Sequence, residues 1–93
     1  VQSTGGPDVT IRHNNISGAS NAAVQTGGSV VNMTIENNLL SGGGWTLNLS
    51  GTVTNIHIIN NRFVDDAAYG PWAVNDPAAI ITGNAYVDGS PIP

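Results

Sequence analysis

The chain has 93 residues, of which 9% are charged, and its formal net charge is −4. This length allows one domain, near the size at which burial of a core only just offsets chain entropy. The two cations, Arg12 and Arg62, are too few for the basic face that binds nucleic acid, and the absence of cysteine excludes a disulfide framework and thiol chemistry.

Short apolar alternations, separated by glycine, asparagine and proline turns, run along the whole chain. The clearest covers residues 45–49, whose period of two residues is that of a β-strand. We expect one domain over residues 1–93, with a lead-in at 1–7, coils over 8–89 and a tail at 90–93. No segment has the pattern of a signal peptide or a membrane span. In chain order, strands are predicted at residues 9–16, 22–26, 33–40, 45–49, 56–64, 72–74 and 79–87.

One pattern recurs four times along the chain. An apolar pair two residues apart is followed three residues later by an asparagine, and two residues further on by another apolar side chain. The asparagines are Asn14, Asn38, Asn61 and Asn84, so the successive steps are 24, 23 and 23 residues. A fixed period of this size indicates stacked units, none of which can bury its apolar face alone. Because no helical pattern separates the copies, we predict an all-β parallel β-helix (β-solenoid) of about four coils, each of 23–24 residues.

Equivalent residues of such a solenoid stack about 4.8 Å apart along its axis. The pattern therefore predicts two interior stacks of apolar side chains, with Ile35 and Ile58 as fully buried neighbours. One stack contains Ile11, Ile35, Ile58 and Ile81, and the other contains Ile16, Leu40, Phe63 and Tyr86.

The repeats at residues 9–16, 33–40 and 56–63 resemble those of right-handed parallel β-helices of the pectate-lyase-like superfamily, which commonly run apolar-x-Ile-x-x-Asn-x-apolar. The copy at residues 79–86 departs from this pattern because Gly83 replaces a polar residue. The resemblance covers roughly residues 8–89 and implies a right-handed β-helix with an asparagine ladder at one tight turn. It leaves the function open, because the superfamily holds lyases, hydrolases, epimerases, phage tail proteins and adhesins.

The four asparagines are interpreted as a structural ladder rather than as the lining of a sugar groove. Stacked amides bond to one another, and asparagine tolerates the left-handed backbone that a tight turn needs. The residues that precede three of them, His13, Asn37 and Asn60, are expected to point outward.

Three carboxylates are the weak candidates for a metal or catalytic site. Asp65 and Asp88 occupy the same repeat position one coil apart, and Asp66 is adjacent. In register, the side chains of Asp65 and Asp88 would lie about 5 Å apart. Paired acids at that spacing can hold Ca²⁺ or share acid and nucleophile roles in glycoside cleavage. The first two coils carry Gly18 and Gly42 at this position, so we favour a solvated turn and assign no catalytic residue, metal or cofactor.

The aromatic residues Trp45, Tyr69 and Trp72 are the best candidates for ligand contact, because exposed aromatic faces stack on sugar rings. Trp45 shares its parity with Leu47 and Leu49. Packing in the core or over a coil is therefore the favoured interpretation, with carbohydrate contact as the alternative.

The first functional hypothesis is a non-catalytic structural or recognition module of a larger extracellular or virion assembly, such as a phage tail, a capsid-associated fibre or a secreted adhesin. It rests on the paucity of ionisable residues, which leaves a surface of Asn, Thr, Ser, Gly and Ala. The alternative hypothesis is that these are the C-terminal coils of a polysaccharide lyase or glycoside hydrolase whose active site lies outside this chain. A basic residue near Asp65, Asp66 and Asp88 is missing, so we expect these 93 residues to have no lyase or glycosidase activity.

The two ends of the solenoid are expected to differ. Pro91 and Pro93 cannot donate ladder hydrogen bonds and Asp88 adds charge. We therefore expect strand pairing to stop at the C-terminal edge. Residues 1–7 are too short and too polar to cover the first coil, and bare strand edges invite pairing. We therefore expect further coils or neighbouring subunits as partners, in a homo-oligomer or a virion.

Overall fold

The computed structural model describes residues 2–18 and 22–92, and within them the side chains of residues 8–18 and 22–92. All regular structure in these residues is β-strand, and they contain no helix of the length and hydropathy needed to cross a membrane. The strands are β1 (Gln2–Arg12), β2 (Asn15–Gly18), β3 (Val24–Glu36), β4 (Leu39–Gly42), β5 (Trp45–Leu49), β6 (Thr52–Ile59), β7 (Arg62–Phe63), β8 (Gly70–Val74), β9 (Ile80–Thr82) and β10 (Ala85–Tyr86).

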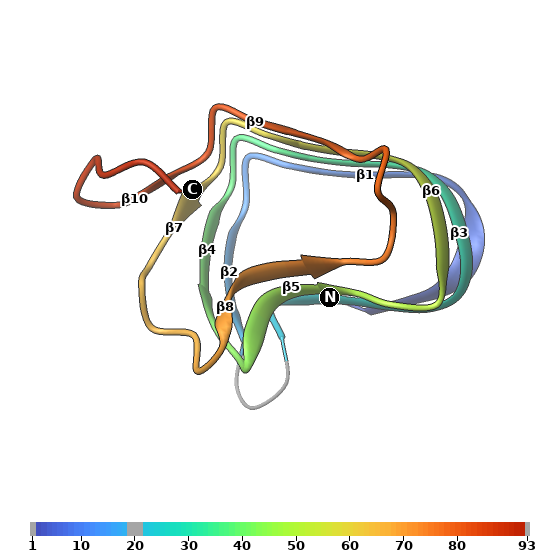
Figure 1. Cartoon of the computed structure of the whole chain (residues 1–93), viewed down its shortest axis with the longest axis horizontal. Helices are drawn as coiled ribbons and strands as arrows, with labels where there is room; N and C mark the ends of the chain where they lie inside the picture. The colour runs from blue at the N-terminus through green and yellow to red at the C-terminus, as the bar shows by residue number, and fades with distance from the viewer. Residues whose placement is uncertain (1, 19–21, 93) are drawn as a thin grey trace.

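The strands form two parallel sheets that wrap around one interior (Figure 1). One sheet has the order β8-β5-β3-β6-β9, with β1 also paired to β3, and the other has the order β10-β7-β4-β2. β3 bends around a corner of the contour. Its first residues pair with β5 and its later residues, from Ser29 to Glu36, pair with β6. Parallel strands joined without helices make a β-solenoid, which confirms the predicted all-β fold.

The pairing register follows the sequence period. Ile11 pairs with Ile35, Ile35 with Ile58, and Ile58 with Ile81. These steps complete about three turns, and the predicted count of four coils was too high because four copies of a strand enclose three full turns. Residues 2–7, expected as a lead-in, are part of β1, and Gln2 already pairs with Gln25 of β3.

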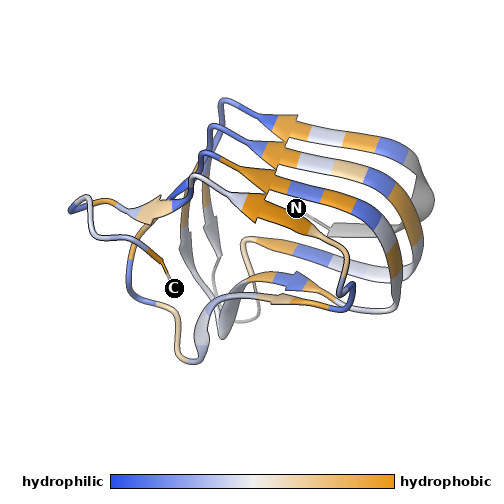
Figure 2. Ribbon diagram, turned by 45° about the horizontal axis from the view of Figure 1, so that its top comes forward, coloured by the Kyte–Doolittle hydropathy of each residue, from blue (hydrophilic) through white to orange (hydrophobic). Residues whose placement is uncertain are grey.

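The core is a set of apolar stacks that run along the solenoid axis. Ile35 and Ile58 are completely buried neighbours, as predicted, and so are Leu40 and Phe63 in the second stack. A third stack contains Val24, Leu47 and Trp72 on β3, β5 and β8. Figure 2 shows the hydrophobic positions in line from one coil to the next. Each fully buried side chain of this size contributes about 1.5–3 kcal/mol.

The corner after β4 requires glycine. Gly42 has φ +84°, and a Cβ there would lie 2.1 Å from the carbonyl oxygen of Gly18 in the preceding coil. Two coils can stack at this corner only where no side chain intervenes. The corner also sets the direction of β5, which begins at Trp45.

Candidate functional site

The four repeat asparagines form a ladder, which we call the inner ladder, and its two middle members lie inside the solenoid. Asn38 and Asn61 are buried, at 3% and 0% exposure. The Asn61 side-chain oxygen accepts hydrogen bonds from the Asn38 backbone N–H and the Asn38 side-chain amide, both at 3.0 Å. The Asn61 amide donates to the Ile35 carbonyl at 2.9 Å, and the Asn38 amide to the Ile11 carbonyl at 3.0 Å. Each buried carboxamide thus ties its own coil to a neighbour.

The same contacts extend to both ends of the inner ladder. The Asn14 backbone N–H donates to the Asn38 side-chain oxygen at 3.0 Å, and the Asn61 backbone N–H donates to that of Asn84 at 2.9 Å. The Asn84 amide continues the pattern by donating to the Ile58 carbonyl at 2.8 Å. The buried Asn38 and Asn61 side chains are therefore engaged with the fold and have little capacity left for a ligand.

The left-handed backbone lies one residue earlier than the sequence suggested. At these four turns the residue with positive φ comes immediately before the inner-ladder asparagine: His13 (56°), Asn37 (55°), Asn60 (54°) and Gly83 (71°). Gly83, which departs from the repeat pattern, therefore occupies a position where a glycine backbone is favourable. The apparent mismatch in the fourth copy is consistent with the turn geometry.

A second ladder, which we call the outer ladder, lies on the surface at the residues immediately before each of the first three copies. Asp8, Asn32 and Asn55 have φ of 59°, 61° and 54°. The Asn32 amide donates to the Asp8 carboxylate at 3.0 Å, and the Asn55 amide donates to the Asn32 oxygen at 2.6 Å. His57 Nε2 lies 3.1 Å from the Asn55 oxygen. The sequence does contain a pattern that indicates this ladder, because a polar residue precedes each of the first three copies at one-coil spacing. The repeat pattern used for the prediction began one residue later and did not include it.

The three candidate carboxylates lie in two different local structures. Asp66 accepts a hydrogen bond from the Gly42 N–H at 2.7 Å, which ties its loop to the preceding coil. Asp88 lies in a turn that closes on Tyr86 and accepts from the Ser90 N–H at 2.9 Å and from the Ser90 hydroxyl. The Ser90 hydroxyl, and then the Ser90 N–H, hold the pKa of the Asp88 carboxyl below its ordinary value.

These carboxylates do not form a metal centre with their neighbours. Pairing between β7 and β10 ends at Phe63 and Tyr86, so it does not extend to Asp65 and Asp88. Asp65 is exposed. Within residues 2–18 and 22–92, no group of three His, Cys, Asp or Glu side chains could hold a metal ion.

The three aromatic candidates are placed in two environments. Trp45 and Tyr69 form a tilted pair, with ring centroids 5.9 Å apart, and Tyr69 is 75% exposed. The Trp45 ring lies over Gly70, where a Cβ would come within 2.9 Å of it. Trp72 instead faces the interior and packs edge-on against Phe63, with centroids 5.5 Å apart. Trp45 and Tyr69 can thus meet a ligand, whereas Trp72 packs at the end of a core stack.

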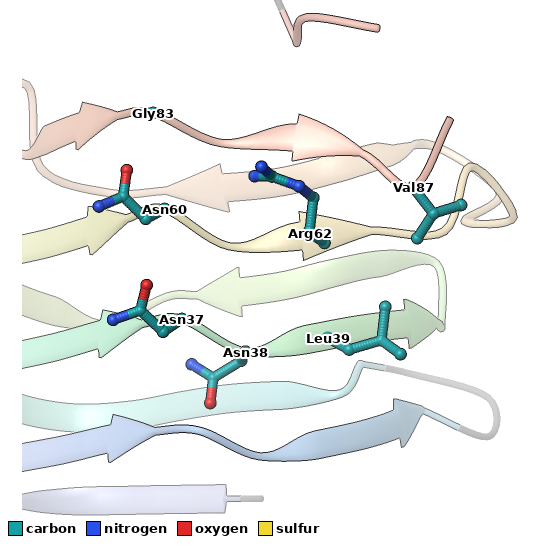
Figure 3. A pocket seen from close by; sticks show the side chains of 7 residues that line it. All are labelled: Asn37, Asn38, Leu39, Asn60, Arg62, Gly83 and Val87. Carbon is teal, nitrogen blue, oxygen red and sulfur yellow. The ribbon is translucent and has the colours of Figure 1, made fainter. Parts of the chain in front are cut away.

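A groove with a volume of about 630 Å³ runs beside the turn that leads into β4, β7 and β10. Figure 3 shows Asn37 and Asn60 above one another on successive coils, with Arg62 between Asn60 and Val87. The sequence predicted that Asn37 and Asn60 point outward, but it did not predict the groove. The groove depends on how close the turns at these residues lie to the outer face of β7, which only the fold determines. Its lining residues are Asn37, Asn38, Leu39, Asn60, Arg62, Gly83 and Val87.

A smaller hollow of about 300 Å³ lies beside Trp72 and Ile81, at the C-terminal end of the core stacks. Ile92, from the tail, lines this hollow and packs against the core. The tail therefore folds over part of this end, and Pro91 forms an antiparallel bridge with Ala85.

Comparison with protein families, curated proteins and solved structures finds no match to the chain. The parallel β-solenoid therefore rests on the strand pairing and the buried stacks described above.

Proposed function

We propose that the chain is a non-catalytic structural and recognition module, a segment of a pectate-lyase-like right-handed β-helix in a larger extracellular or virion assembly. The observation that supports this proposal best is how the buried polar side chains are used. Asn38, Asn61, Thr26 and Thr46 all bond to the protein's own groups, and no buried side-chain polar atom in the described residues lacks a partner. At Asn38, Asn61 and Thr26 the bond joins one coil to the next, whereas the Thr46 hydroxyl donates to the Gly42 carbonyl of its own coil.

Carbohydrate contact is proposed for the Trp45–Tyr69 pair. The exposed Tyr69 ring lies beside Trp45, so a sugar ring could stack on an aromatic face that is held in place by its neighbour. The expected result of titrating the chain with oligosaccharides is a change in Trp45 fluorescence. A Tyr69→Ala variant should lose this response, while Tyr86→Phe, a change at the other tyrosine, should keep it.

Further coils or neighbouring subunits are proposed to adjoin β1. In the described residues β1 pairs only with β3, so its second edge is unpaired, and Val9 and Ile16 are only half-buried. Free strand edges favour association. Sedimentation of the 93 residues is expected to show self-association. A soluble monomer at high concentration, with the amides of residues 9–16 unprotected from hydrogen exchange, would contradict the proposal.

The alternative proposal is that these coils belong to a polysaccharide lyase or glycoside hydrolase with its active site outside this chain. It is favoured by the position of Asp65 and Asp66 in the loop that also carries the exposed Tyr69. Incubation of the 93 residues with polygalacturonate or alginate distinguishes an active site within this chain from one outside it. We expect no products, and cleavage that disappears in Asp65→Asn would overturn the non-catalytic assignment.

A further inference from the structure

We propose that the C-terminal end of the solenoid binds the first coil of a second copy of this chain, head to tail, with Asn14 of the incoming copy extending the inner ladder beyond Asn84. This inference rests on the self-association proposed above. It deepens that proposal because it names the surface that meets β1 and the orientation of the two copies.

The three junctions between successive inner-ladder asparagines use the same two hydrogen bonds. The backbone N–H of one asparagine donates to the side-chain oxygen of the asparagine in the next coil, at 2.9–3.0 Å. The amide of that next asparagine donates back to an isoleucine carbonyl of the earlier coil, at 2.8–3.0 Å. Each coil therefore presents an N–H and a carbonyl on its C-terminal side, and both are satisfied by the asparagine that follows.

The last coil presents these two groups without the asparagine that would satisfy them. The Asn84 N–H makes no hydrogen bond within the described residues, whereas the equivalent N–H groups of the three earlier coils all do. The Ile81 carbonyl is equivalent to the three isoleucine carbonyls that accept an asparagine amide, and no further inner-ladder asparagine lies beyond it in residues 2–18 and 22–92. The hollow of about 300 Å³ that Ile81 and Asn84 line leaves space for one at this position.

The first coil carries the matching half of the contact. The Asn14 side-chain oxygen accepts no hydrogen bond among the described residues, and the Asn14 amide donates to the Arg12 carbonyl of its own coil at 2.8 Å. Val9 and Ile16 lie at the same end and are only half-buried. An asparagine with unused capacity and apolar side chains are therefore presented together at the outer edges of β1 and β2, the first strands of their sheets.

The apolar stacks continue across a head-to-tail junction in the register that they keep inside the chain. With Asn14 one coil beyond Asn84, Ile11 of the second copy follows Ile81 and its Ile16 follows Tyr86. Ile81 and Tyr86 are half-buried in the last coil. Covering them with the isoleucines of a second copy removes apolar surface from water at both ends, which favours association.

A head-to-head contact through two β1 edges does not satisfy the same groups. It sets two Asn14 side chains against each other and leaves both Asn84 N–H groups without an acceptor. The head-to-tail contact uses a different surface on each copy. Such an interface repeats into rows of growing length, whereas a head-to-head contact closes at a dimer.

Residues 88–92 compete with the second copy for part of this end. The Tyr86 N–H donates to the Ser90 carbonyl at 3.0 Å and Pro91 forms its bridge with Ala85, so this segment occupies an edge of β10. Figure 1 shows that much of the segment lies outside the contour of the coils. Within the described residues β9 pairs only with β6, so its outer edge is open. The incoming copy therefore stacks on β9 and displaces the segment from β10.

The test combines sedimentation of the 93 residues over a range of concentrations with hydrogen exchange of assigned amides. We expect species that grow beyond a dimer as the concentration rises, and an Asn84 amide that becomes protected as they form. Asn14→Ala should weaken the association by about tenfold, because it removes both ladder bonds at the junction. Truncation after Val87 should strengthen the association, because nothing then competes for the edge of β10.

Asn15→Ala is the matched control. Asn15 is the exposed neighbour of Asn14, and its side chain makes no hydrogen bond within the described residues. We expect this variant to change the association by less than about twofold. Equal losses in the two variants, an Asn84 amide that stays unprotected, or growth that stops at a dimer would overturn the head-to-tail contact and leave the proposed self-association intact. A chain that stays monomeric at every concentration would contradict both proposals.

Discussion

The inner ladder and the outer ladder are built from similar residues at the same period, yet they have different relations to the fold. Inner-ladder residues Asn38 and Asn61 are buried and bond to the main chain of a neighbouring coil. Outer-ladder residues Asn32 and Asn55 are exposed and bond to other side chains.

The difference shows that burial, rather than residue type or spacing, decides what a stacked asparagine contributes. A buried backbone group without a partner costs about 1–3 kcal/mol, whereas an exposed group can bond to water instead. The inner ladder is therefore expected to stabilise the solenoid, and the outer ladder chiefly to order its turn. Four substitutions or titrations test this comparison.

The largest effect is expected for Asn61→Ala. The change leaves the Asn38 N–H and the Ile35 carbonyl without their side-chain partners in a buried environment. Two such groups cost about 2–6 kcal/mol together. The free energy of unfolding in urea measures this loss. Asn61 is absent from the positions with positive φ, so alanine adds no backbone strain, and a loss below about 1 kcal/mol would contradict a stabilising role for the inner ladder.

Ile35→Ala provides an apolar reference for the same interior. Ile35 is completely buried between Ile11 and Ile58, and emptying such a site costs about 2–5 kcal/mol. The same urea series gives the value. A loss below about half a kilocalorie would mean that the stack register is incorrect.

Asn32→Gly tests the outer ladder and should have a small effect. Glycine keeps the left-handed backbone at φ 61° while it removes the bonds to Asp8 and Asn55. Exposed substitutions of this kind usually change stability by less than about 0.5 kcal/mol. A loss as large as that of Asn61→Ala would refute the distinction between the two ladders.

The smallest effect concerns a third polar contact, between Asp88 and Ser90 in the exposed tail. Because the folded pKa of Asp88 is lowered, its stabilising contribution is complete above the unfolded value, about 3.9, and is lost as the pH falls through the folded pKa. Ser90→Ala should move the Asp88 pKa upward. Carbon-detected NMR titration of the carboxyl group checks this, and an unchanged pKa would show that the Ser90 hydroxyl has no influence.

The sequence by itself determined the architecture of the stack. A strict alternation of apolar residues fixes which side chains face inward, and a period of 23–24 residues fixes which of them become neighbours. Ile35 and Ile58 were identified as buried partners for this reason. Turn boundaries were less accurate: the left-handed residue proved to be Asn37 rather than Asn38.

Only the tertiary structure decided what the polar and aromatic residues contact. Trp45 and Trp72 were equal candidates in the sequence. In the fold Trp45 contacts Tyr69, at the end of the loop before β8, and Trp72 contacts Phe63 in the interior. Asp88 lies beyond the last paired residues of β7 and β10, in a turn where the Gly89 N–H donates to the Tyr86 carbonyl. The groove beside Arg62 lies where the stacked turns at Asn37, Asn60 and Gly83 adjoin the outer face of β7. Periodicity specifies neighbours along the axis, whereas contacts across a corner depend on how far each loop departs from the repeat.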